Sequence, residues 1–224
     1  LYQVQPSDAA RHLTVCDEAI RAGVGLAWEI KDRYAFVVAA MPDRHGLLAD
    51  VTATLTGNLF DILDARTWVT ASGMVLYHFR LASPIPARLA EASTWKRLRT
   101  DLLAISTGTL DPRTLLEKRR TMIGLTKAAD SRFDDPAVKV DGKTSEHHTI
   151  VDVHAKDEPG LLSRLCRAMS EQHCNISYAC INTMGDVAVD VFYVTRNGAK
   201  LSDDEANVLK QDLINSLQLT VAGT

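Results

Sequence analysis

Residues 40–48 read AMPDRHGLL, and residues 154–162 read HAKDEPGLL. Aligning the Asp and the Gly of the two stretches gives a displacement of 114 positions. The same displacement carries residues 61–62 (DI) onto residues 175–176 (NI). One register that holds through a turn, a helix and the next strand indicates a duplicated unit, whereas an array of short repeats would show a period of about 20–50 residues.

The order of elements in each copy follows from its local pattern. Strands are expected where β-rich runs are bounded by polar residues. A helix is expected after each Asp-x-x-Gly turn, because apolar residues recur there at i, i+4 and i+8. The expected strands are residues 34–40, 62–70 and 74–82 in the first copy and 149–155, 176–183 and 187–195 in the second, and a helix closes each copy. An extra strand, residues 24–30 or 137–141, is expected to pair with the strand that follows it.

The resulting unit has the order ββαββα, with its helices on one face of an antiparallel sheet. We therefore expect an α+β fold made of two ferredoxin-like sandwiches, packed sheet edge to sheet edge. A leading helix precedes them, and its apolar side is expected to carry Ala9, Leu13, Cys16 and Ile20. The expected division is 1–23 for the leading helix, 24–106 for the first unit, 107–135 for a helical connector and linker, and 136–224 for the second unit.

The composition argues against several classes of protein. A formal net charge of −3 gives no reason to expect a nucleic-acid or membrane-surface partner, and no apolar run approaches the ~18 residues of a membrane span. The four cysteines form no Cys-x-x-Cys pair. They are expected as buried, reduced thiols, which favours a cytoplasmic location and no metal site. Because the chain opens at Leu1 without a signal-peptide pattern, we expect it to be a piece of a longer polypeptide.

The repeated turn is the best candidate for a functional site. Each turn leads into a helix N-terminus, whose free N–H groups and positive dipole end favour a carboxylate. The strand that follows begins with Asp61 in one copy and Asn175 in the other. Asn175 suits an amide or an amino-acid zwitterion and Asp61 suits an ammonium group, so an amino acid is expected near Asp157–Leu161 and Asn175. The alternative is that these residues only end strands and cap helices. The candidate ligand-binding residues are Asp43, His45, Gly46, Leu47, Asp61, Asp157, Glu158, Pro159, Gly160, Leu161 and Asn175.

Other polar residues favour structural interpretations. Asp190 lies in an otherwise apolar strand and is expected on its open face, exposed or hydrogen-bonded; Tyr77 takes the matching place in the first copy. The basic run at 118–120 (KRR) is expected on a solvated helix face. His45 replaces the proline of the second turn, which predicts a more flexible, pH-sensitive loop. No catalytic motif, phosphate-binding loop or dinucleotide fingerprint occurs, so we expect neither catalytic residues nor a cofactor.

The turn at 157–162, the pair at 175–176 and the strand at 188–194 (AVDVFYV) resemble an ACT domain. The first copy is similar at 43–48 and 61–66. More narrowly, nearly the whole chain resembles the tandem ACT domains at the end of the bacterial uridylyltransferase/uridylyl-removing enzymes, which modify the nitrogen signal protein PII. The resemblance implies glutamine sensing, with nucleotidyltransferase and phosphohydrolase domains lying upstream. The first copy departs from the family pattern at His45, where proline is usual, and at Tyr77, where Asp is usual.

Two functions from different classes remain open at this point. The first is an amino-acid-sensing regulatory module, with glutamine as the first ligand to test and pairing of ACT units between two chains as a further expectation. The second is a scaffold that binds a protein partner through its sheet edges and takes no small molecule. Exposed apolar residues along the outer strands would favour the scaffold. RNA binding by a similar sandwich is not expected, because the basic and aromatic strand signature is missing.

Overall fold

The two copies fold into two like units joined through one continuous sheet. The computed structural model describes residues 6–122 and 136–218. The first unit comprises β1 (Gly25–Lys31), β2 (Tyr34–Pro42), α2 (Leu47–Gly57), β3 (Asp61–Val69), β4 (Met74–Ala82), η1 (Pro86–Ala90) and α3 (Ala92–Ser106). The second comprises β5 (Ala137–Asp141), β6 (Thr149–Lys156), α5 (Leu161–Glu171), β7 (Cys174–Cys180), β8 (Thr183–Met184), β9 (Val187–Arg196) and α6 (Asp203–Gln218). The helix α1 (Pro6–Ala22) precedes the first unit, and α4 (Pro112–Met122) follows it.

The expected ββαββα order and antiparallel sheet are confirmed, apart from the short additional β8. The strands lie in the order β1-β2-β4-β3-β7-β9-β6-β5, and β3 pairs with β7 in antiparallel register. Ala65 lies directly opposite Ala179, its own counterpart in the repeat. An antiparallel ladder centred on two equivalent residues gives the two units a local pseudo-twofold relationship. The units are therefore packed sheet edge to sheet edge.

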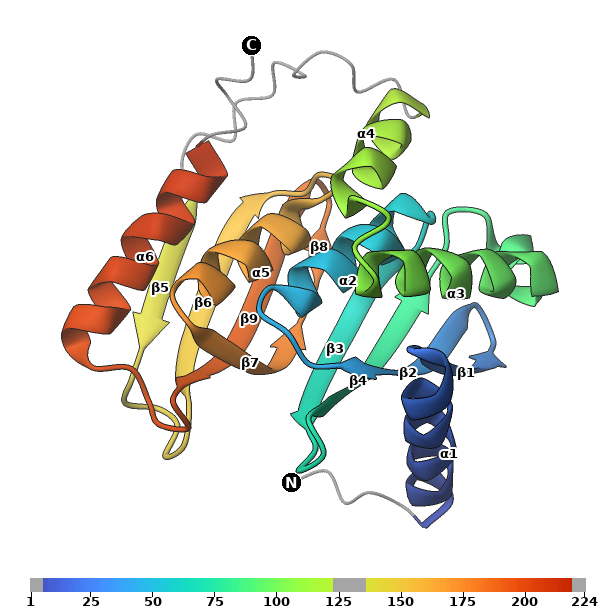
Figure 1. The fold of residues 1–224 in the computed structure, drawn as a ribbon. Coiled ribbons are helices and arrows are strands. Elements are labelled where there is room, and N and C mark those ends of the chain that lie inside the picture. Colours follow the sequence, from blue (N-terminus) through green and yellow to red (C-terminus); the bar gives the residue numbers. More distant parts are fainter. Residues whose placement is uncertain (1–5, 123–135, 219–224) are drawn as a thin grey trace.

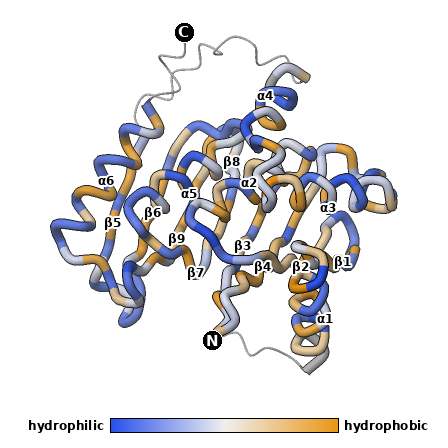
Figure 2. Tube along the Cα trace, in the orientation of Figure 1, coloured by the Kyte–Doolittle hydropathy of each residue, from blue (hydrophilic) through white to orange (hydrophobic). Residues whose placement is uncertain are grey.

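The helices α2, α3, α5 and α6 form a layer on one face of the sheet (Figure 1). Strand residues alternate between the two faces, so β6 and β9 bury every second side chain under this layer. In Figure 2, α6 alternates hydrophilic and hydrophobic residues along its length, as a helix with one buried face requires. The core is one continuous cluster that includes Trp95 and Leu98 of the first unit and Phe192 and Leu209 of the second.

The helix α1 packs on the opposite face of the first unit. Its Val15 and Ala19 form a second cluster with Val38, Ala40, Met74 and Leu76. The apolar side expected from the sequence was wrong, because Leu13 and Ile20 are 69% and 64% exposed. The reason is that α1 carries apolar residues on two sides, and only one of them meets the sheet. Across residues 6–122 and 136–218, no helix is long and apolar enough to cross a lipid bilayer.

Candidate functional site

Each repeated turn ends in a glycine that starts a helix. Gly46 caps α2 with φ 74°, and Gly160 caps α5 with φ 90°. Side chains rarely adopt this left-handed backbone conformation, which accounts for a glycine at both positions. The turns are anchored alike, because Asp43 N donates to Gly73 O at 2.9 Å and Asp157 N donates to Asp186 O at 2.8 Å. Each turn is thereby tied to the hairpin of its own unit.

Two pockets lie between the units, one at each turn. The Asp43 turn forms pocket 1, of about 360 Å³, together with Asn175 at the start of β7. The Asp157 turn forms pocket 2, of about 420 Å³, together with Asp61 at the start of β3. Both volumes fall in the range of small-molecule sites. Pocket 1 is lined by the candidates Asp43, His45, Gly46, Leu47 and Asn175, and pocket 2 by Asp61, Asp157, Glu158, Pro159, Gly160 and Leu161.

This grouping differs from the sequence-based expectation. The sequence placed one ligand between the Asp157 turn and Asn175 of the same copy, whereas the structure puts them in different pockets. The physical reason is the pairing of the inner strands. Since β3 and β7 run antiparallel and α2 packs against α5, the start of each inner strand lies beside the turn of the other unit. Each pocket therefore contains residues from both copies.

Pocket 1 is lined by the polar side chains of Ser170, Asn175 and Tyr77 as well as by Asp43 and Arg44. Gly46 N donates to Ser170 Oγ at 3.0 Å, which links the first turn to α5. His45 lies with either ring nitrogen 3.4 Å from Ser170 Oγ, and its ring centroid is 5.6 Å from that of His173. Asn175 is exposed, whereas Tyr77 is buried. Burial raises the pKa of the Tyr77 hydroxyl far above its ordinary range, so this group stays neutral. The pH sensitivity of the His45 turn stays a prediction.

Pocket 2 is more strongly charged. Asp157 accepts a hydrogen bond from Thr183 Oγ1 at 3.1 Å, and Glu158 pairs with Arg164. Asp190 takes the place that Tyr77 has in pocket 1 and is 1% exposed. Burial raises the pKa of Asp190 to about 7, against a hydrogen bond from the Asn182 N–H at 3.4 Å that favours the ionised form. The expected open-face position was wrong, because the carboxyl group shares the helix-covered face with Ala188 and Phe192.

Arg119 is a pocket residue that the sequence interpretation missed. The basic run was expected to be solvated, but Arg119 is 9% exposed, whereas Lys118 is exposed. Its Nη1 donates to Thr56 O at 2.6 Å and to Phe60 O at 3.2 Å, and its Nη2 donates to Asp61 Oδ1 at 2.8 Å. The signal in the sequence was spacing: Arg119 follows the buried Leu115 by four residues and so lies on the same face of α4.

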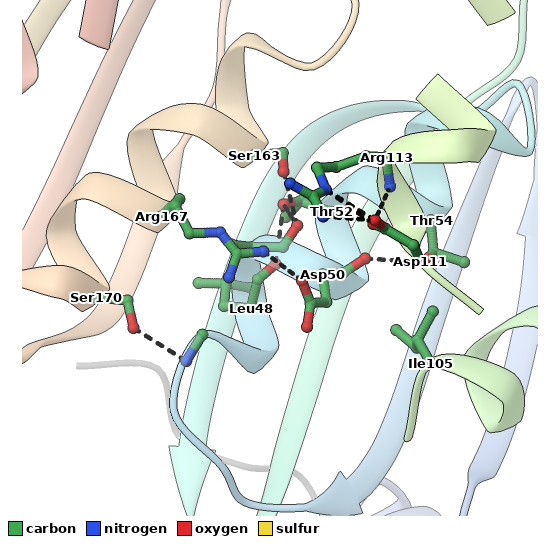
Figure 3. Close-up of polar contacts among 12 residues, drawn as sticks. Leu48, Asp50, Thr52, Thr54, Ile105, Asp111, Arg113, Ser163, Arg167 and Ser170 are labelled. Atoms are coloured by element: carbon green, nitrogen blue, oxygen red, sulfur yellow. Dashed lines mark hydrogen bonds and ion pairs between the residues drawn. The ribbon is translucent and has the colours of Figure 1, made fainter. Parts of the chain in front are cut away.

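A polar seam between α2 and α5 connects the two units (Figure 3). Asp50 of α2 accepts a hydrogen bond from Arg44 Nη2 at 2.6 Å and also pairs with Arg167 of α5. Ser163 Oγ of α5 donates to Ala49 O at 2.8 Å. Since Arg44 belongs to the first turn and Arg167 to α5, one carboxylate links the turn that lines pocket 1 to a helix of the second unit.

Comparison with known proteins agrees with this architecture. Residues 137–223 match a family model described as "ACR9-like, ACT-like domain". The chain is 32% identical over 214 residues to the bifunctional uridylyltransferase/uridylyl-removing enzyme of Phenylobacterium zucineum, covering 92% of this chain and 22% of that protein. The resemblance to ACT domains is confirmed. The enzyme of the same name from Novosphingobium aromaticivorans is 34% identical over 208 residues, covering 91% of this chain and 22% of that protein.

The chain thus spans about a fifth of the length of the curated relatives it matches. It is related to part of these enzymes, and its second unit matches an ACT-like domain model. Among solved structures, aspartate kinase from Synechocystis is similar with a TM-score of 0.41 and 16% identity, covering 84% of this chain and 28% of that chain. The two units share one sheet, and both pockets lie where these units meet.

Proposed function

We propose that this chain is an amino-acid-sensing regulatory module, and that glutamine is its first candidate ligand. The observation that carries the proposal is the composition of each pocket. A turn from one unit and a strand start from the other line the same cavity, so a ligand held there contacts both units. Binding energy at such a place can favour one relative placement of the units over another.

The chemistry of pocket 1 suits an amino acid with an amide side chain. The start of α2 offers backbone N–H groups and the positive end of the helix dipole to a carboxylate. Asp43 supplies a carboxylate for an ammonium group, and Asn175 supplies both a donor and an acceptor for a side-chain amide. Pocket 2 repeats the turn and the helix start, but with Asp61 in the place of Asn175.

The wider setting forms part of the same proposal. The relatives are named for uridylyl transfer and uridylyl removal. We infer that the chain regulates a nucleotidyltransferase and phosphohydrolase acting on PII in nitrogen control, in the cytoplasm, and that ACT units pair between two chains. A coupling free energy of ~1–3 kcal/mol between the amino-acid pocket and the catalytic domains would suffice for this control.

The alternative is a scaffold that binds a protein partner and no small molecule. It has one observation in its favour, because Trp28 and Ile30 on the outer strand β1 are each 39% exposed. An apolar edge strand of this kind is a typical site for pairing with another chain.

Calorimetric titration with glutamine, and then with the other amino acids, separates the two functions. A saturable heat that Asn175→Ala abolishes would support a sensor working in pocket 1. Asn207→Ala is the matched control, because Asn207 is an exposed residue of α6 outside both pockets. No heat from folded protein with any amino acid would contradict the sensor and favour the scaffold.

A further inference from the structure

The connecting helix α4 bridges pocket 2 and contacts both units there. Leu115 packs so closely on Gly57 of α2 that a Cβ at position 57 would lie 2.4 Å from the Leu115 Cβ. Leu116 lies against Gly160, where an added Cβ would be 3.1 Å from the Leu116 Cδ1. One helical turn after Leu115, Arg119 reaches Asp61. The wall of pocket 2 thus includes a side chain from outside the two repeated turns.

The contacts of Arg119 break the pseudo-twofold relationship of the pockets. Asp61 and Asn175 are counterparts in the repeat, and each lines its pocket at the start of an inner strand. Asp61 already accepts a charge-assisted hydrogen bond from Arg119. In the described part of the chain, no arginine donates a hydrogen bond to the Asn175 side chain. The two pockets therefore present different groups to a ligand.

We propose that Arg119 makes the two pockets unequal, because it is a built-in donor at Asp61 that keeps pocket 2 closed to the amino acid bound by pocket 1. This inference rests on the proposed function. An amino or amide N–H group of a ligand that donates to Asp61 Oδ1 has to displace Arg119, and one that donates to Oδ2 meets a carboxylate whose charge the guanidinium group already offsets. That exchange breaks a charge pair and withdraws a 9%-exposed side chain from the carbonyls of Thr56 and Phe60. A small ligand replaces the bond to Asp61 but leaves those buried acceptors without this donor, which is costly.

The proposal makes the number of binding sites the decisive quantity. Titration with glutamine, by calorimetry and by equilibrium dialysis, is expected to give one site per chain. Arg119→Met is expected to add a second site with an affinity within about tenfold of the first. The double variant Arg119→Met/Asp61→Ala should lose that second site again, because position 61 then offers neither a donor nor an acceptor. Lys118→Met is the matched control, because it removes an exposed charge from the same helix and should leave one site.

Two equal sites in the unaltered chain, or a folded Arg119→Met variant that still has one site, would overturn the proposal. If Arg119→Met does not fold, Arg119→Gln replaces it, because its amide can still donate to the carbonyls of Thr56 and Phe60. The same second site is expected in Arg119→Gln, and its absence would overturn the proposal. Binding by the Arg119 variants alone would support the role of Arg119 while contradicting the sensor at pocket 1. No binding by any of these folded proteins would overturn both.

Discussion

Asp50 offers the sharpest test of how the two units are held together. Its side chain is 10% exposed and pairs with Arg44 of the first turn and Arg167 of α5. Asp50→Asn keeps the shape of the side chain and removes its charge. A shielded charge-assisted hydrogen bond contributes about 1.5–3 kcal/mol. The two arginine side chains are 38% and 44% exposed, so we discount the sum for solvent screening to about 2 kcal/mol.

Urea denaturation is the appropriate assay, with thermal unfolding as a second measurement. The variant is expected to lose about 2 kcal/mol of unfolding free energy, which corresponds to about 4–8 °C in Tm for a protein of this size. Glu171→Gln on α5 is the matched control, because Glu171 is exposed and Asp50 is buried. A loss in Asp50→Asn below about 0.5 kcal/mol, the usual effect of a surface change, would refute the inference that this seam holds the units together.

Three further predictions follow from packing and burial. Gly25→Ala places a Cβ 1.8 Å from Val15 O, so it is expected to lower the free energy of unfolding by about 1–3 kcal/mol and to speed hydrogen exchange in α1. Gly142→Ala, with open space around it, should do neither, and equal exchange in both variants would contradict the close packing of α1. The pKa of Asp190 is raised to about 7 from the ~3.9 of an unfolded chain, so its stabilising contribution is complete below pH ~4 and is lost as the pH rises through 7. Asp190→Asn should remove up to about 4 kcal/mol of the pH dependence of the unfolding free energy and should be more stable than the unaltered chain at pH 8. The same pH profile of unfolding free energy in both proteins would show that the carboxyl group is not desolvated. Burial raises the pKa of Cys174 to about 11 and that of Cys166 further. Iodoacetamide at pH 8 should therefore alkylate the half-buried Cys16 and Cys180 first, and early labelling of Cys166 would indicate local opening of α5.

The sequence was sufficient for the order of elements within each unit. The period of the apolar residues changes from two in the strands to about 3.6 in the helices, and both periods occur twice in one register. The glycines at 46 and 160 also have a local explanation, because a helix start in a left-handed conformation favours a residue without a side chain. Local patterns of this kind are encoded by neighbours in the chain.

The assembly of the pockets could not be read in the same way. Pairing of β3 with β7 joins residues more than 100 positions apart, such as Ala65 and Ala179, and no local pattern marks one edge strand as the partner of another. Asp190 and Arg119 were misplaced for a related reason. An isolated polar residue in an apolar strand or on a short helix is usually exposed, and only the tertiary structure shows that Asp190 is buried and that Arg119 reaches a carboxylate and two carbonyls.

The pseudo-twofold relationship also constrains how a ligand can act on this module. Both pockets are bounded by the same two units, so a rotation about the β3–β7 ladder that narrows one pocket must change the other as well. In pocket 2, α4 contacts both units through Leu116 and Arg119, and it resists such a rotation. In pocket 1, the Asp50 seam and the Gly46–Ser170 hydrogen bond are the corresponding ties. A change in the shape of pocket 1 therefore involves polar contacts between α2 and α5, whereas a change in pocket 2 also involves the packing of α4 on both units.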